Sequence, residues 1–195
     1  MQPYPRSVVL DGDTFTLRLM APGDEDAILQ FAHGLPEHDL LFLPRDISEP
    51  RVVKAWMSEI GRGIISLLAI HDGQIVGCAT LVRDLLSWSK HVGELRIVTA
   101  RAVRHRGLGR LLLQDIFAVA IAEGVDKIYA QMTTDQRAAI ALFEDLGFRA
   151  EALLREHVRD RSGHAHDIVT MGNVVARALA RLEAMGVVAA TSHRA

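Results

Sequence analysis

The stretch Arg104-His105-Arg106-Gly107-Leu108-Gly109-Arg110 decides the fold of this chain. It follows an extended run at residues 91–99, and after it apolar residues recur on one helical face, at Leu108, Leu112, Ile116 and Val119. Glycines at a helix start leave backbone N–H groups unshielded, and these groups attract anions together with the helix dipole. Basic or near-basic side chains add positive charge there: Arg104, His105, Arg106 and Arg110. The segment therefore predicts a phosphate or pyrophosphate site between a strand and a helix.

Two common phosphate-binding motifs do not fit this segment. A P-loop needs a lysine followed by Ser or Thr, and no lysine occurs between Lys90 and Lys127. A Rossmann fingerprint needs a third glycine, but Gly109 is followed by Arg and three leucines at 110–113. The anion site must belong to another class of fold.

The rest of the chain alternates between extended and helical patterns. Extended runs are predicted at 7–10, 14–20, 64–70, 75–82, 91–99, 127–132, 148–158 and 164–171. Helices are predicted at 24–32, 48–60, 107–124, 135–146 and 174–185. This order predicts an α/β or α+β fold in which helices cover a mixed sheet. No composition shift marks a boundary, so we expect one domain over residues 1–195, with a C-terminal helix and tail from about residue 172.

Composition and charge narrow the classes of function. The chain has 195 residues, 22 basic against 24 acidic, and a net charge of −2, which disfavours nucleic acid as a partner. Residues 1–10 lack the apolar core of a signal peptide, and apolar stretches such as 67–70 are too short to cross a bilayer. Cys78 is the single cysteine, so no intrachain disulfide can form and a cytoplasmic location fits best. The sequence leaves the oligomeric state open, a homodimer included.

Two segments together resemble the GNAT acetyltransferases. Residues 104–109 resemble the family's acyl-CoA signature, Arg/Gln-x-x-Gly-x-Gly/Ala, and the stretch Ala138-Ala139-Ile140-Ala141-Leu142-Phe143-Glu144-Asp145-Leu146-Gly147-Phe148 resembles its later helix and Leu-Gly-Phe exit. The paired match covers about residues 92–171. The resemblance implies a twisted mixed sheet of six to seven strands with about four flanking helices, splayed between its fourth and fifth strands.

The resemblance also implies acetyl-CoA as cosubstrate, without a metal. Its pantetheine arm would pair with the backbone of Ile97, Val98 and Thr99. Its pyrophosphate would be held by the signature segment: Arg104, His105, Arg106, Gly107, Leu108, Gly109 and Arg110. Gln136 stands where the family often places an Asn that contacts the CoA arm. Phe143 stands where many relatives have a tyrosine that protonates the departing thiolate.

The implied reaction is direct transfer of the acetyl group to a primary amine. Residues 8–44 resemble the start of GNAT domains in bacterial protein-lysine acetyltransferases, which favours a protein lysine as acceptor. A small amine such as an amino acid or an antibiotic is the alternative. A CoA-binding regulatory module without turnover is a third reading, which Phe143 and Gln136 support.

Amine acetylation needs a base, because only about one lysine-like amine in 10³ to 10⁴ is unprotonated at neutral pH. Glu94 is the candidate, since the family often places a glutamate near this position and burial could raise its pKa. The alternative for Glu94 is a structural partner of Arg96. Tyr129 could donate a proton to the thiolate if its side chain faces the cleft. Backbone N–H groups near Val98 and Thr99 could stabilise the oxyanion.

Each of several other polar residues can be interpreted either as structural or as functional. Cys78 could form an acyl-enzyme, but a core role is favoured. A group of His157, His164, His166 and Asp167 could bind a metal, but its spacing matches no strong zinc pattern and favours polar roles across strands or at the acceptor site. A group of Glu37, His38, Asp39 and Asp46 could attract a cationic amine or simply be solvated. Arg177, Arg181 and Glu183 would form a solvated helix face.

Overall fold

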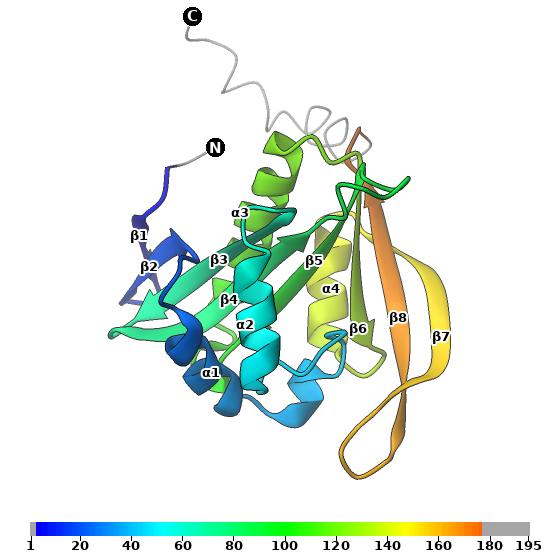
Figure 1. Ribbon diagram of the computed structural model, residues 1–195, viewed down its shortest axis with the longest axis horizontal. Helices are drawn as coiled ribbons and strands as arrows, with labels where there is room; N and C mark the ends of the chain where they lie inside the picture. Colours follow the sequence, from blue (N-terminus) through cyan, green and yellow to red (C-terminus); the bar gives the residue numbers. More distant parts are fainter. Residues whose placement is uncertain (1–2, 177–195) are drawn as a thin grey trace, which may run out of the picture.

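The strands join into a single sheet in the computed structural model, which describes residues 3–176 (Figure 1). The sheet order is β1-β2-β3-β4-β5-β6-β8-β7, and β5 and β6 are its one parallel pair among the described residues. The strands are β1 (Arg6–Leu10), β2 (Asp13–Leu19), β3 (Ile64–His71), β4 (Gln74–Val82), β5 (Val92–Thr99), β6 (Lys127–Thr133), β7 (Arg149–Arg159) and β8 (Ala165–Val174). The helices are α1 (Glu25–His33), α2 (Pro50–Ser58), α3 (Leu108–Ala122) and α4 (Arg137–Asp145), with 3₁₀ turns η1 (Glu37–Leu40) and η2 (Arg101–Val103).

Each face of the sheet carries its own hydrophobic core. Helix α3 packs on β3, β4 and β5, and its fully buried Leu112 and Ile116 share a core with Phe143 of α4. Helices α1 and α2 cover the other face, where Ile28 and Val53 pack against Val98 of β5. Figure 1 shows α1 and α2 in front of the sheet and α3 behind it. Successive side chains of the central strands therefore enter different cores.

The sheet splits between β5 and β6. These strands pair only where Val92–Glu94 runs beside Lys127–Tyr129. Beyond that point β5 continues to Thr99 and β6 to Thr133 without pairing to each other. Because unpaired strand edges present free N–H and C=O groups, the split leaves backbone of β5 available to a ligand.

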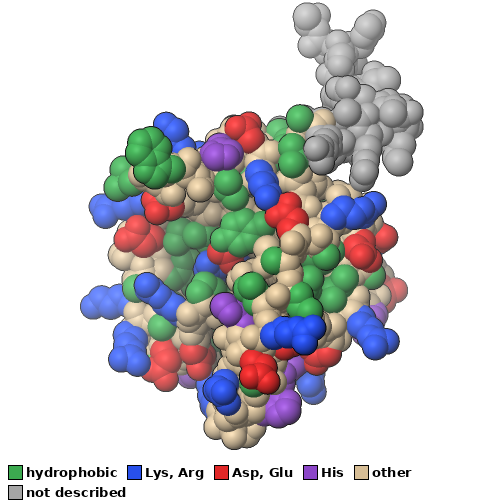
Figure 2. Space-filling model, turned by 90° about the vertical axis from the view of Figure 1, so that its right-hand side faces the viewer, with side chains coloured by type: hydrophobic (Ala, Val, Ile, Leu, Met, Phe, Trp, Pro, Cys, Tyr) green, Lys and Arg blue, Asp and Glu red, His purple; other side chains and the backbone are tan. Residues whose placement is uncertain are grey.

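Strand β7 forms one edge of the sheet and is mostly exposed. Figure 2 faces this side of the molecule and shows charged side chains of both signs with hydrophobic ones between them. One of the ion pairs joins Lys127 to Glu151, with the Nζ and Oε2 atoms 2.7 Å apart. Charges along an edge strand hinder pairing with a second chain.

The fold class predicted from the sequence is confirmed, with two differences in detail. The sheet has eight strands instead of six or seven, because the Asp11-Gly12 turn separates a complete strand, β1, from β2. The split expected between the fourth and fifth strands therefore lies between the fifth and sixth. Strand β8 runs to Val174, where a helix was predicted to begin, because Asn173 and Val174 pair with β6. Residues 175 and 176 are helical, and the predicted helix from residue 177 on, with Arg177, Arg181 and Glu183, lies outside the described residues. Within residues 3–176, no helix combines the length and apolar character needed to cross a membrane.

Candidate functional site

The start of α3 presents unpaired backbone amides. Gly107 precedes the helix with a φ of 83°, and no side chain caps this end. The first hydrogen bond onto the helix runs from the Leu111 N–H to the Gly107 carbonyl, at 3.0 Å. The N–H groups of Leu108, Gly109 and Arg110 therefore have no acceptor within the helix, as at any helix N-terminus. This end of α3 has the free donors that the expected anion site requires, and anion binding here stays a prediction.

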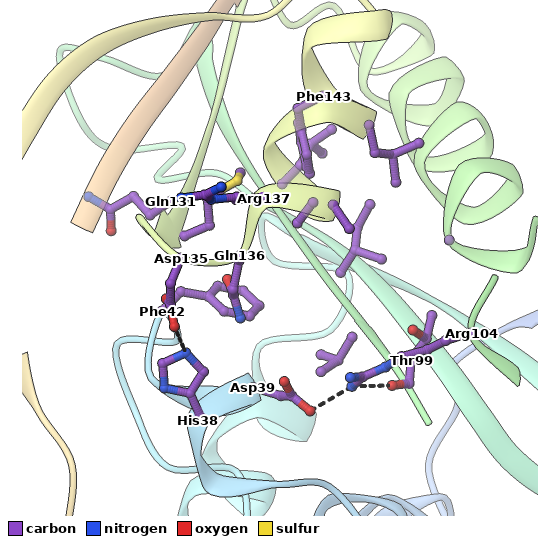
Figure 3. Close-up of a pocket in the computed structure, with 18 of the residues that line it drawn as sticks. His38, Asp39, Phe42, Thr99, Arg104, Gln131, Asp135, Gln136, Arg137 and Phe143 are labelled. Carbon is purple, nitrogen blue, oxygen red and sulfur yellow. Dashed lines mark hydrogen bonds and ion pairs between the residues drawn. The ribbon is translucent and has the colours of Figure 1, made fainter. Parts of the chain in front are cut away.

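A pocket of about 510 Å³ runs from this helix end into the split between β5 and β6. On the β5 side it is lined by Leu95, Ile97, Val98 and Thr99, and on the other side by residues of β6 and α4 that include Met132, Gln136 and Phe143 (Figure 3). Phe143 is 5% exposed and its ring packs edge to face on Phe148, with centroids 4.9 Å apart. The pocket thus joins anion-binding amides to the free edge of a strand.

The cationic side chains of the signature segment do not all face this pocket. Arg104 and His105 line it. Arg106 is turned toward the β1–β2 turn, where it pairs with Asp11 and Asp13 and lies over the ring of Phe15. The expectation that all four basic side chains surround one anion is therefore wrong for Arg106.

The side chains of two further signature residues also lie away from the pocket. Arg110 pairs with Asp145 of α4 at 2.5 Å. Leu108 is 1% exposed and packs in the core under α3. In this arrangement these residues, like Arg106, offer an anion in the pocket their backbone N–H groups.

Residues 35–47, here named the strap, cross the far end of the split. Asp39 accepts a hydrogen bond from Arg104 at 2.6 Å, and the same Arg104 nitrogen donates to the Thr99 carbonyl at 3.1 Å. His38 lies 2.8 Å from Asp135, which follows β6 (Figure 3). The strap is therefore tied to both sides of the split.

The strap is also tied to the β7–β8 turn. Arg161 pairs with Asp46 at 2.8 Å, and its backbone N–H donates to Glu37. Hydrogen bonds from Ser48 and then Arg161 lower the pKa of Asp46 to about 2. The strap acids were expected to attract a cationic amine, but all three, Glu37, Asp39 and Asp46, are already engaged by arginines. The partners in these pairs are 65 to 124 residues apart in the sequence, so local sequence patterns could not predict the pairing.

Glu94 lies on the face of β5 opposite to α3, and it lines neither this pocket nor the one described below. It is 7% exposed, and its two oxygens accept hydrogen bonds from Arg96 at 2.8 and 2.7 Å. The Tyr129 hydroxyl donates to the same carboxylate at 3.2 Å. Burial, followed by the nearby Glu94 charge, raises the pKa of Tyr129 to about 12. The register of β6 thus directs Tyr129 toward Glu94.

The other residues singled out in the sequence have local partners. Cys78 is 4% exposed in the core under α1 and α2, and burial raises the pKa of its thiol to about 12, which suits a core role. His166 pairs with Asp160 at 2.9 Å, and its ring packs against His164 and against His38 of the strap. Asp167 accepts the Glu156 N–H at 2.8 Å. These are polar contacts within and across the β7–β8 hairpin.

A family model described as the acetyltransferase (GNAT) family matches residues 35–148, which is more than half of the chain. The chain belongs to the GNAT family of acetyltransferases. The match spans the strap, the start of α3 and the Leu-Gly-Phe exit of α4. All the residues that line the pocket described above therefore lie within the segment that matches the GNAT family model.

Two curated relatives match parts of the GNAT chain. Probable N-acetyltransferase 14 of Danio rerio is 35% identical over 86 residues, 43% of this chain and 29% of that protein. The [ribosomal protein bS18]-alanine N-acetyltransferase of Salmonella typhimurium is 33% identical over 66 residues, 34% of this chain and 45% of that protein. The chain thus spans less than half the length of either relative.

A solved structure shows the same fold over nearly its full length. YncA of Salmonella typhimurium, described as an acetyltransferase with its cofactor acetyl-CoA, has a TM-score of 0.69 and 21% sequence identity. The likeness covers 83% of this chain and 94% of that one. At this identity the comparison establishes the GNAT fold.

Proposed function

We propose that this protein transfers the acetyl group of acetyl-CoA to a primary amine. One observation carries the proposal. A single pocket joins the backbone N–H groups at the start of α3, which have no acceptor within the helix, to the edge of β5 that has no partner strand. Membership of the GNAT family and a relative whose structure contains acetyl-CoA support the same conclusion. We also propose that residues 1–195 form one domain, and that the protein acts in the cytoplasm.

The chain offers acetyl-CoA two kinds of backbone partner. N–H groups between His105 and Arg110 are suited to the pyrophosphate, because they combine free donors with the positive end of the helix dipole. At Ile97, Val98 and Thr99, the edge of β5 that faces away from β4 is suited to the amide groups of the pantetheine arm. Arg104, Gln136 and Phe143 would complete the walls of this site.

In the proposed reaction the amine nitrogen attacks the thioester carbon, a C–N bond forms, and the C–S bond breaks with its electron pair leaving on sulfur. Backbone N–H groups near Val98 and Thr99 stabilise the oxyanion. Glu94 is the proposed base, and because Arg96 occupies both of its oxygens, it receives the amine proton through a water molecule. Phe143 has no proton to give, so the CoA sulfur leaves as thiolate, which a thiol of pKa about 8.5 can do.

Two acceptors follow from the sequence, a protein lysine and a small amine. The segment that resembles protein-lysine acetyltransferases favours the first. One relative acts, by its name, on an alanine of ribosomal protein bS18. An acceptor panel must therefore contain lysine peptides, alanine-ended peptides and small amines.

Release of CoA thiol tests the proposal directly. The protein is incubated with acetyl-CoA and each amine in turn, and free thiol is measured against a reaction without acceptor. We expect amine-dependent release with at least one acceptor. Binding of acetyl-CoA without release for any amine would instead support a CoA-binding regulatory module, the reading that Phe143 favours.

A further inference from the structure

A second pocket, of about 340 Å³, lies under α2 on the opposite face of β4 and β5 from α3. Val98 lines both pockets, and the strap passes from Phe42 in the first pocket to Leu43 in the second. The second pocket therefore reaches β5 at the residue where the first pocket also meets it. Its volume is that of a site for a small ligand.

The walls of the second pocket are largely hydrophobic, formed by Ile47, Val52, Ala55, Trp56, Ile64 and Val82 among others. The polar groups behind them are bound to one another. The Trp56 indole N–H donates to the Ser66 hydroxyl at 3.2 Å, and that hydroxyl shares a hydrogen bond with Thr80 at 3.0 Å. An N–H or O–H donor entering this space would lose its hydration and meet hydroxyl groups that already take part in hydrogen bonds.

The charges of the second pocket disfavour a second cation. Arg96 lines it, and the carboxylate that balances Arg96, Glu94, has both oxygens occupied. Arg45 and Glu59, of opposite sign, are exposed at its mouth. An ammonium group held inside, beside Arg96, would meet a guanidinium, because the remaining carboxylate of the lining, Glu59, is exposed at the mouth. Such a position is costly in a partly dehydrated site.

We propose that the second pocket holds the acceptor, and that the acceptor is a primary amine on a bulky, uncharged hydrophobic body, aromatic or branched. This inference rests on the proposed function, because the amine is to reach the thioester at Val98. A lysine side chain is a narrow, unbranched stem and would leave much of the hydrophobic wall without contacts. Of the two acceptors above, the pocket therefore favours the small amine.

Three amines and a peptide test the inference by steady-state kinetics on the unaltered protein. Pentylamine and 1,5-diaminopentane have the same chain and differ in a second ammonium, and 2-phenylethylamine adds a ring. We expect kcat/KM to fall in the order 2-phenylethylamine, pentylamine, 1,5-diaminopentane, with at least about a tenfold span. A short peptide with one lysine should be no better than 1,5-diaminopentane.

Ala55→Phe places a ring inside the second pocket from the α2 side. We expect KM for 2-phenylethylamine to rise at least about tenfold, while calorimetry gives an unchanged Kd for acetyl-CoA. Lys54→Phe is the matched control, because Lys54 is exposed on the same helix and does not line the pocket. If Ala55→Phe fails to fold, the amine series on the unaltered protein decides alone.

Two results would overturn the inference: turnover of 1,5-diaminopentane or the lysine peptide as efficient as that of 2-phenylethylamine, or an Ala55→Phe protein that folds and keeps its acceptor KM. Failure of the proposed function looks different. In that case acetyl-CoA does not bind, or no amine of any kind releases CoA.

Discussion

Replacing Glu94 by Gln separates the structural and chemical roles of this carboxylate. The side chains of Glu94 and Arg96 are 9% and 23% exposed, and their nearest N and O atoms are 2.7 Å apart. Opposite unit charges with centres near 4 Å apart attract by about 4 kcal/mol at an effective dielectric constant of about 20. Gln keeps one accepting oxygen but leaves the guanidinium charge uncompensated, so we expect to lose about 3 kcal/mol of unfolding free energy. For a chain of this length that lowers Tm by roughly 6–12 °C.

The assay is urea unfolding of the parent, Glu94→Gln, Arg96→Met and the double variant. Each single variant leaves one buried charge without its partner. The double variant removes both charges and should therefore recover at least half of the unfolding free energy that Glu94→Gln loses. A Glu94→Gln protein within about 0.5 kcal/mol of the parent, the usual range for surface changes, would refute the reasoning.

The same proteins test the proposed base when acetyl transfer is measured well below the lower Tm. If Glu94 accepts the amine proton, kcat stays low in the double variant even though stability has recovered. The loss should be greatest at low pH, where more of the amine is protonated. A pH profile equal to that of the parent would remove Glu94 from the mechanism.

Three further outcomes are expected. Gly107→Ala should lower the unfolding free energy, measured with urea, by about 1–2 kcal/mol. An L side chain at a φ of 83° is strained, even though no atom lies within 4 Å of the added Cβ. Gly107→Asn should lower this free energy less. Gly93→Ala should also cost about 1–2 kcal/mol, here by overpacking, since the new Cβ would lie 2.7 Å from a Leu81 methyl carbon; an unchanged urea midpoint would contradict this. The hydrogen bond from Arg18 holds the pKa of Asp24 below its usual 3.8, so its stabilisation is present above that pH and is lost as pH falls. The unfolding free energies of the parent and Asp24→Asn should therefore differ at pH 7 and converge toward pH 2.

Local patterns sufficed to predict the elements that build the first pocket. The glycines before Leu108 and the apolar face after it identified the strand, turn and helix around the anion site, because helix starts and helical periodicity are encoded within a few residues. The direction of each arginine was not encoded in this way. Arg106 and Arg104 are two residues apart, yet one pairs with Asp13 and the other with Asp39, which lie 93 and 65 residues away.

The second pocket was also beyond local patterns. Its walls come from the strap, α2, β3, β4 and β5, and each of these segments reads in the sequence as an ordinary contributor to a core. The three-dimensional packing of α2 on the sheet is what shows that part of the hydrophobic surface between them remains uncovered.

Within the sheet, β5 and β6 are joined by only a short stretch of pairing beside the split. On one side of it lie β1 to β5 with α3, and on the other lie β6, β8, β7 and α4. The strap contacts made with Arg104 and Arg161 at the far end of the split are partly exposed ion pairs. Mobile ions weaken such pairs, so we expect higher salt to loosen the hold of the strap on both sides of the split, while the shared core under α3 and α4 keeps the two parts together.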